Sequence, residues 1–228
     1  MTMTVALVLA LGLVMAMVAV GAALEGHVVR AMTQTWREVA QMHGLRLEAG
    51  RGGIFPTPGQ VVGEYRGYAV ALCRRDRVDA MQAEALGERR DRCWVVTTTL
   101  KSELPVRLWV TRALGASVAG IWDKGVSVAV GDRAFDEAFH VTGEGDEEEV
   151  RRVLSWPVRE ALLTLNRGPY VVWVTPEEVS VAFAAALDAD AVHGILEAQH
   201  TVADALCRRG AELVLEECRE PAVAVAMR

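Results

Sequence analysis

The chain has 228 residues and a formal net charge of −6. This acidic balance argues against a surface that coats nucleic acid, because such binding rests on Lys and Arg side chains that neutralise phosphates. Lysine occurs only at Lys101 and Lys124, and we attribute the excess of arginine to GC-rich codon use and not to phosphate binding. The length allows one sizeable hydrophobic core or two small ones beside any membrane segment.

The first predicted element is an apolar helix. The run from Val5 to Leu24 contains no charged residue, Asn, Gln or Pro. At about 1.5 Å per residue, it is long enough to cross a hydrocarbon core of roughly 30 Å. We interpret residues 1–24 as a transmembrane anchor and the lipid bilayer as the partner of residues 5–24. A cleaved signal peptide and a buried core helix are the alternatives; the absence of Lys and Arg from residues 1–4 disfavours the signal peptide.

The residues that flank this run predict its orientation. The N-terminal side offers only the α-amino group, whereas arginines follow the run at Arg30, Arg37, Arg46 and Arg51. Because Lys and Arg collect on the cytoplasmic side, we expect a single-pass protein of the bacterial inner membrane with a cytoplasmic domain. The cysteines lack metal-binding spacing and fit reduced thiols in that compartment: Cys73, Cys93, Cys207 and Cys218.

A juxtamembrane helix is predicted over residues 25–44. Its apolar positions recur every three or four residues, and Gly44 suits a helix stop: Val28, Met32, Trp36, Val39 and Met42. Trp36 lies roughly 18 Å beyond Leu24 along a straight helix, so we expect it to pack on the domain and not in the membrane interface.

The soluble domain is predicted over residues 45–220, with a frayed tail at 221–228. Its strands are expected at Leu45–Glu48, Val61–Tyr65, Tyr68–Cys73, Cys93–Leu100, Val106–Thr111, Val126–Val130, Ala138–Thr142, Tyr170–Val174, Val179–Phe183 and Glu212–Glu217. Arg66-Gly67 is a predicted hairpin turn, and the fourth and fifth strands of this series are expected to be antiparallel neighbours. Residues 51–59 and 74–92 are predicted loops, the second with a short helix as an alternative.

Two or three helices complete the expected fold. The apolar period from Val150 to Leu165 is interrupted at Pro157, with Ser155 as a candidate N-cap of the second part. A last helix is expected from Asp188 to Arg209 and to stop at Gly210. Without βαβ alternation, the order predicts an α+β domain of mainly antiparallel strands behind one transmembrane helix.

The common catalytic and cofactor-binding motifs are absent, including the Walker loop, Gly-x-Ser-x-Gly and His-Glu-x-x-His. Two polar constellations deserve a test. The last helix aligns His193, Glu197, His200 and Asp204 on one stripe, which a metal could use but which we interpret as a solvated face. We therefore assign no catalytic, cofactor-binding or metal residue and expect no cofactor.

The second constellation is the group Asp132, Asp136, Glu137 and His140. A carboxylate near a histidine can perform acid–base chemistry, but a turn capped by Asp132 is the favoured interpretation. The acidic run Glu144–Glu149 is interpreted as a solvated loop, with a basic partner or a cation as the alternative.

The stretch from Gly131 to Val141 also carries a resemblance. It resembles a Gly-Asp-x-x-Phe-Asp-x-x-Phe-x-Val pattern of uncharacterised, membrane-anchored bacterial proteins, and Trp36-x-x-Val39-Ala40 resembles their juxtamembrane helix. The resemblance implies a bacterial origin and an anchor-plus-domain plan. That family has no assigned activity, so no functional residue carries over. Phe135 and Phe139, four residues apart, are expected to be core anchors.

These features favour a non-catalytic, membrane-tethered binding or scaffold module with a possible protein partner. An accessory subunit of a larger membrane complex is the first alternative. A membrane-bound hydrolase that uses polar groups between Asp132 and His140 is the second.

Overall fold

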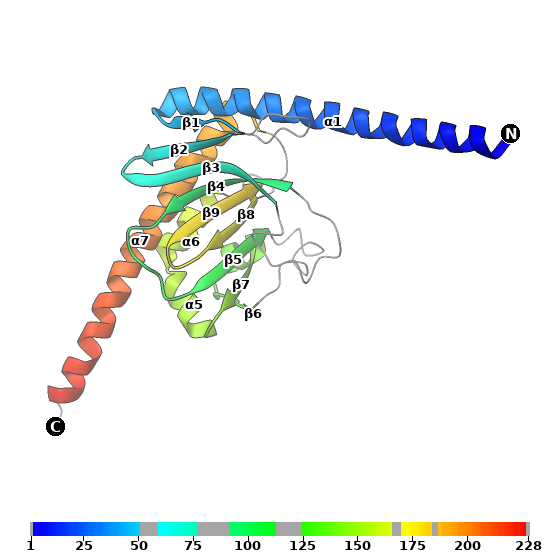
Figure 1. Cartoon of the computed structure of the whole chain (residues 1–228). Helices are drawn as coiled ribbons and strands as arrows, with labels where there is room; N and C mark the ends of the chain where they lie inside the picture. The colour runs from blue at the N-terminus through cyan, green and yellow to red at the C-terminus, as the bar shows by residue number, and fades with distance from the viewer. Residues whose placement is uncertain are drawn as a thin grey trace.

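The computed structural model describes residues 2–50, 59–76, 92–112, 125–165, 170–183 and 187–226. An antiparallel sheet forms the middle of the domain, and two long helices leave it in different directions (Figure 1). The fold is α+β, as the order of strand and helix patterns predicts.

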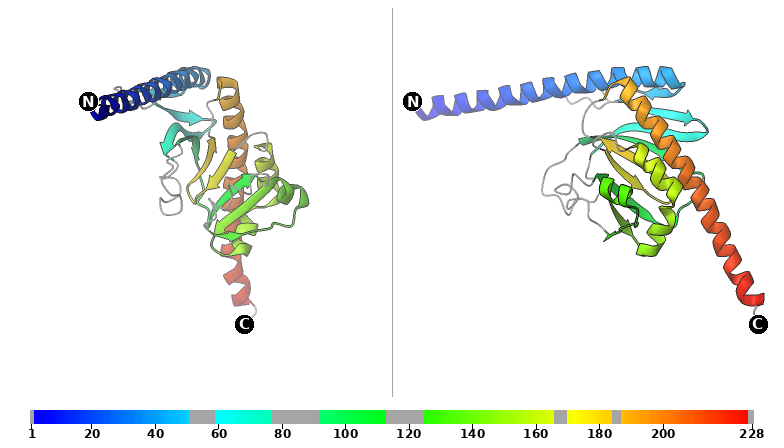
Figure 2. Two further views of the ribbon diagram at one scale, coloured as in Figure 1. Left: turned by 90° about the vertical axis from the view of Figure 1, so that its right-hand side faces the viewer. Right: turned by 180° about the vertical axis from the view of Figure 1, so that it is seen from behind.

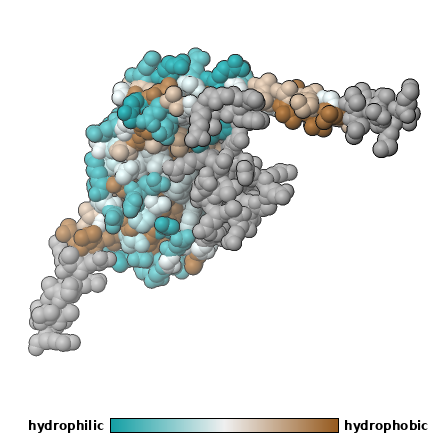
Figure 3. Space-filling view, viewed as in Figure 1, coloured by the Kyte–Doolittle hydropathy of each residue, from teal (hydrophilic) through white to brown (hydrophobic). Residues whose placement is uncertain are grey.

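The N-terminal helix α1 (Thr2–His43) is continuous through the predicted membrane and juxtamembrane segments. It ends where Gly44 adopts a left-handed φ of +67°, as the predicted helix stop requires. In the described part of the chain, one helical stretch, Ala10–His43, is long and apolar enough to cross a membrane, judged by length and composition. Its hydrophobic surface stands out where α1 leaves the domain (Figure 3).

Nine strands form one sheet in the order β1-β2-β3-β4-β9-β8-β5-β7-β6, and each described pairing is antiparallel. The strands are β1 (Arg46–Glu48), β2 (Gln60–Tyr65), β3 (Tyr68–Asp76), β4 (Arg92–Thr99), β5 (Arg107–Arg112), β6 (Val126–Ser127), β7 (Phe139–Glu144), β8 (Tyr170–Val174) and β9 (Glu178–Phe183).

The predicted β2–β3 hairpin is confirmed. Arg66 and Gly67 both have positive φ, at +50° and +83°, which is the backbone that a type I′ turn requires. Strand β3 runs on to Asp76, three residues into the predicted loop 74–92. Arg92, the last residue of that predicted loop, begins β4. Residues 77–91 between them, and residues 51–58 of the other predicted loop, lie outside the described residues.

Two strand predictions are wrong in part. Strands β4 and β5 are not neighbours, because β9 and β8 lie between them in the sheet. Strand β9 pairs with β4 in a register that aligns Val181 with Val96, so the apolar hairpin β8–β9 takes the central position. The strand predicted at Val126–Val130 is shortened to β6, although the amide of Val128 still donates to the carbonyl oxygen of Val141 at 3.0 Å.

Short helices precede the last one: α4 (Arg133–Ala138), α5 (Glu147–Val153) and α6 (Trp156–Thr164). The predicted break near Pro157 is confirmed, with Pro157 in the first turn of α6. Ser155 takes the N-cap position, but its side chain makes no capping hydrogen bond there. Helix α5 is capped by Asp146, whose carboxylate accepts from the amide of Glu148 at 3.3 Å.

The last helix, α7 (Ala189–Ala226), does not stop at Gly210, and the strand predicted at 212–217 is helical. Gly210 allows a close approach instead. A Cβ atom at this position would stand 3.2 Å from the carbonyl oxygen of Glu103 and 3.3 Å from the Leu104 side chain. The helix also passes the predicted boundary at residue 220 and continues to Ala226.

The main core lies between one face of the sheet and the helices α1, α4, α5, α6 and α7 (Figure 2). Gln199 of α7 is fully buried in it and donates from Nε2 to the carbonyl oxygens of Val96 and Val179, at 3.0 and 2.8 Å. The opposite face carries a smaller apolar cluster around Val95 and Trp173. Cys73 and Cys93 lie in strands β3 and β4, as predicted, and Cys93 is buried in this smaller cluster.

Candidate functional site

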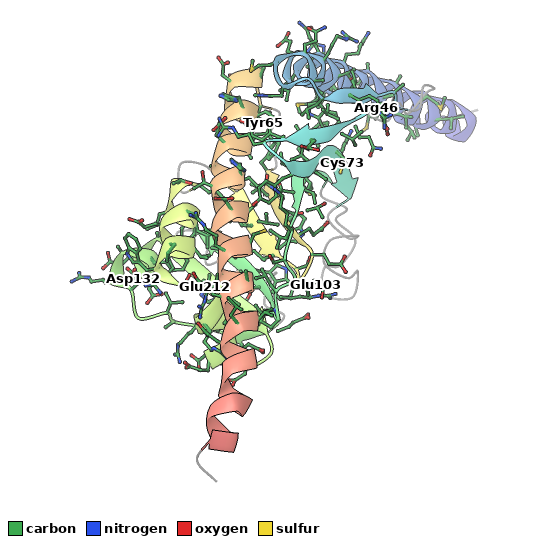
Figure 4. The ribbon with its side chains drawn as sticks, turned by 90° about the vertical axis from the view of Figure 1, so that its left-hand side faces the viewer. Arg46, Tyr65, Cys73, Glu103, Asp132 and Glu212 are labelled. Carbon is green, nitrogen blue, oxygen red and sulfur yellow. The ribbon has the colours of Figure 1, made fainter. Side chains whose placement is uncertain are left out.

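The polar stripe of α7 meets the end of α1 and the β2–β3 hairpin. All four of its residues are half-buried, so the stripe faces protein as well as solvent, and the prediction of a solvated face is wrong in part. Tyr65 lies where the hairpin reaches α7 (Figure 4). We call this cluster the polar joint; it consists of His43, Tyr65, Arg66, Tyr68, His193, Glu197, His200 and Asp204.

The hairpin supplies two tyrosines to the joint. Tyr65 and Tyr68 flank the turn as cross-strand partners, so their side chains share one face of the sheet. The Tyr65 hydroxyl donates to a Glu197 carboxylate oxygen, and the Tyr68 hydroxyl donates to Oδ1 of Asp204 at 3.0 Å. Arg66, from the turn itself, places Nη2 2.8 Å from Oε1 of Glu197. The hairpin is thereby fixed to α7 through two carboxylates.

Histidines connect the same region to α1. Nε2 of His43, the last residue of α1, lies 3.2 Å from Nδ1 of His193, and the rings stack with centroids 4.9 Å apart. His43 also meets the Tyr65 ring edge-on at 5.0 Å. His200 packs against both tyrosines, with centroid distances of 6.1 Å to Tyr65 and 5.4 Å to Tyr68. The joint therefore brings three elements together: α1, the hairpin and α7.

The electrostatics follow from this packing. The hydrogen bond from Tyr65 is the main cause that lowers the pKa of Glu197, with Arg66 adding to it. Burial, followed by the bond to Glu197, raises the pKa of Tyr65 to about 12. Burial and then the neighbouring His193 lower the pKa of His43. The tyrosine is thus neutral and Glu197 charged at neutral pH.

The joint is suited to holding elements together. Each hydrogen bond to a charged group stabilises a folded protein by about 1.5–3 kcal/mol, less where water screens it. Within the described ranges, no group of three or more His, Cys, Asp and Glu side chains is arranged to hold a metal ion.

Sequence reasoning found the α7 stripe but missed its partners. Tyr65, Tyr68 and His43 lie 132 to 150 residues away from the groups they bind in α7. The available signal was the Tyr-Arg-Gly-Tyr sequence of the hairpin, which places two aromatic residues opposite each other at a turn.

The second constellation holds a turn, as the favoured interpretation predicts. Asp132 caps α4 by accepting from the Phe135 amide at 3.2 Å, and it pairs with Arg159 at 3.2 Å. Asp136 accepts from the amides of Val130 and Gly131 at 3.1 and 3.0 Å. Figure 4 shows Asp132 well away from Tyr65, so the two constellations are separate.

The aromatic residues of this motif are core anchors, as predicted. Phe135 and Phe139 are buried, with ring centroids 5.2 Å apart. In the acidic run that follows, Glu147 and Glu148 lie in α5 and pair with Arg151 at 2.6 and 3.7 Å. The second half of the acidic run therefore forms the first turn of α5, where a loop was predicted.

An open groove of about 890 Å³ runs between α6 and α7. Its α7 side is made mainly of small residues, including Gly194, Ala198 and Ala205, and Glu197 connects it to the polar joint. A Cβ atom at Gly194 would meet nothing within 4 Å, so the groove is open at that position.

Comparisons with known proteins bear on the fold. No protein-family model matches the sequence, and no curated protein matches it. Among solved structures, the fold is similar to the crystal structure of the mycobacterial trehalose monomycolate transport factor A, TtfA, with a TM-score of 0.53 and 14% sequence identity. The similarity covers 78% of this chain and 95% of that one. At this identity the likeness concerns the fold alone.

Proposed function

We propose that the chain is a non-catalytic, membrane-tethered binding or scaffold module whose anchor holds the domain at a fixed distance and angle. The observation that carries the proposal is the continuity of α1. The same helix is exposed and apolar from Leu11 to Leu24 and enters the protein core with Met32, Trp36 and Val39. A flexible linker between membrane and domain would have no such continuity.

Packing energies support a rigid connection. Each buried large apolar side chain contributes about 1.5–3 kcal/mol, and Met32, Trp36 and Val39 are almost completely buried. Trp36 contacts Trp94 of β4 edge-to-face, with centroids 5.3 Å apart. The polar joint then fixes the end of the helix at His43.

We further propose a cytoplasmic domain on a bacterial inner membrane. The arginines after the apolar run support this orientation. The residue pattern at 131–141 supports membership of the membrane-anchored bacterial group that it resembles. A protein partner for the domain follows from the scaffold role.

A second candidate function is an accessory role in a larger membrane complex. It is favoured by the structural likeness to a protein named as a transport factor, whose chain is matched over 95% of its length. Purification in a mild detergent distinguishes the two candidates. Co-purification of other membrane chains in fixed ratio supports the accessory role, and a clean monomer counts against it.

Membrane extraction and cysteine labelling test the main proposal. The full chain should stay in the membrane pellet after alkaline carbonate extraction. With cysteine introduced at exposed Glu148, a membrane-impermeant maleimide should label the chain only after the cells are lysed. The parent chain sets the labelling background. Labelling before lysis, in cells whose inner membrane is still intact but accessible to the maleimide, would overturn the orientation.

A further inference from the structure

Two of the three histidines of the polar joint, His43 and His193, form a direct hydrogen bond between the anchor helix and α7. Nε2 of His43 and Nδ1 of His193 are 3.2 Å apart, in hydrogen-bond range, so one of them carries a proton and the other accepts it. Close by, the Thr35 hydroxyl of α1 donates to the carbonyl oxygen of Leu187, which lies two residues before α7, at 3.3 Å.

The surroundings of the pair determine how it responds to acid. From α7, His43 faces His193 and Glu197, and from the hairpin it faces Tyr65 and Arg66. Glu197 favours a charge on His43, but its carboxylate already binds the Tyr65 hydroxyl and Arg66. One proton added to the pair preserves an N–H···N bond. Two protons place an N–H on each facing nitrogen, so that neither can accept and two cations are in contact.

We propose that the His43–His193 pair is a pH-sensitive latch, which holds the last turn of α1 on α7 at neutral pH and releases that turn when both rings are protonated. The inference rests on the proposed tether, because a looser contact with α7 makes the anchored domain less rigid. The release is local, since Trp36 and Val39 stay buried in the core.

Amide hydrogen exchange on the full chain in detergent tests the latch. After correction for the pH dependence of intrinsic exchange, the protection of residues 41–45 should fall about tenfold or more between pH 7.5 and pH 5, because the doubly protonated pair no longer holds the turn. Protection around Trp36 should stay constant. An equally protected last turn at both pH values would overturn the proposal.

Two matched variants test whether the pH-dependent loss of protection comes from the His43–His193 pair. His193→Gln can still donate to His43 but cannot become a cation, so it should keep the protection at pH 7.5 and lose the pH dependence. In the same variant the NMR titration midpoint of His43 should rise. His27→Gln makes the same change at an exposed histidine of the same helix and should behave like the parent chain. An unchanged pH profile in His193→Gln would overturn the latch.

The experiment separates the latch from the tether. Exchange in detergent does not depend on membrane insertion, whereas carbonate extraction of the same chain does. Loss of the chain from the membrane pellet would therefore refute the tether alone, and a flat exchange profile would refute the latch alone.

Discussion

The two halves of α1 use apolar residues in opposite ways. Between Leu11 and Leu24 large apolar side chains surround the helix and stay exposed, for example Leu13 at 65% and Met17 at 67%. Beyond Val29 the buried apolar residues Met32, Trp36 and Val39 recur every three or four positions, and most of the positions between them are polar. The comparison teaches that periodicity distinguishes a segment suited to lipid from one suited to a protein core.

The largest effect is expected from charged residues placed in the first, apolar half of α1. Arg at both Leu13 and Val18 should abolish membrane attachment, because two arginines near the helix centre cost about 5–7 kcal/mol on insertion. Carbonate extraction measures the loss, and circular dichroism should show a folded domain. Alanine at the same two positions is the control and should remain in the pellet. Retention of the double arginine chain there would argue against a membrane helix.

In the second half, Trp36→Ala should destabilise the domain and leave the chain in the membrane. The loss of a buried tryptophan costs about 3–5 kcal/mol. Denaturant midpoints of the detergent-solubilised chain, followed by circular dichroism, give the difference. The control Val28→Ala, on an exposed side chain of the same helix, should change stability by less than about 0.5 kcal/mol. Similar losses of stability in both variants would contradict the packing of the second half of α1 in the protein core.

The joint that fixes the end of α1 should show a defined pH dependence. The Tyr65 hydroxyl lowers the pKa of Glu197 below its ordinary value of 4.5. The native state therefore binds fewer protons than the unfolded chain, so this stabilisation is present above pH 4.5 and is lost as the pH falls through the lowered pKa. Glu197→Gln should remove this part of the profile and cost about 1 kcal/mol at neutral pH.

Glu160→Gln is the matched control for that experiment. Glu160 is exposed on α6, and replacing it by Gln makes the same chemical change at a carboxylate that is not bound to Tyr65. Thermal or denaturant unfolding between pH 3 and pH 7 measures both variants. If the two profiles coincide, the bond between Tyr65 and Glu197 does not stabilise the joint.

The smallest expected effects concern two glycines of α7, the helix on which α1 rests. Gly194→Ala should stabilise the chain by about 0.5–1 kcal/mol, because alanine favours helix and its Cβ meets open space. Gly210→Ala should lack this gain, since its Cβ would be 3.2 Å from the Glu103 carbonyl oxygen. The melting temperatures of the two variants, each compared with the parent chain, measure the difference. Equal gains in the two variants would contradict the close approach at Gly210.

The features that sequence reasoning predicted are those fixed by local signals. Gly44 ends α1, Arg66-Gly67 forms the hairpin, and Pro157 separates α5 from α6, each through the backbone preferences of a few residues. The resemblance at residues 131–141 remains a prediction, although Asp132 and Phe135 there hold a turn and fill the core.

The features that sequence reasoning missed depend on distant neighbours. The position of β9 beside β4 could not be read from either strand alone, because the sequence of neither strand specifies its neighbour in the sheet. Gly210 was taken for a helix stop although its neighbour is the Glu103 backbone. The stripe of α7 was taken for a solvated face because its hairpin partners are more than 130 residues away.

The central claim is that α1 is one rigid helix across the membrane surface. Amide hydrogen exchange of the full chain in lipid nanodiscs at neutral pH tests it most directly. We expect unbroken slow exchange from Leu24 through Ala40, because the segment is helical and is held by lipid at one end and by the core at the other. Fast exchange between Leu24 and Val29, with slow exchange on both sides, would reveal a hinge and contradict the rigid tether.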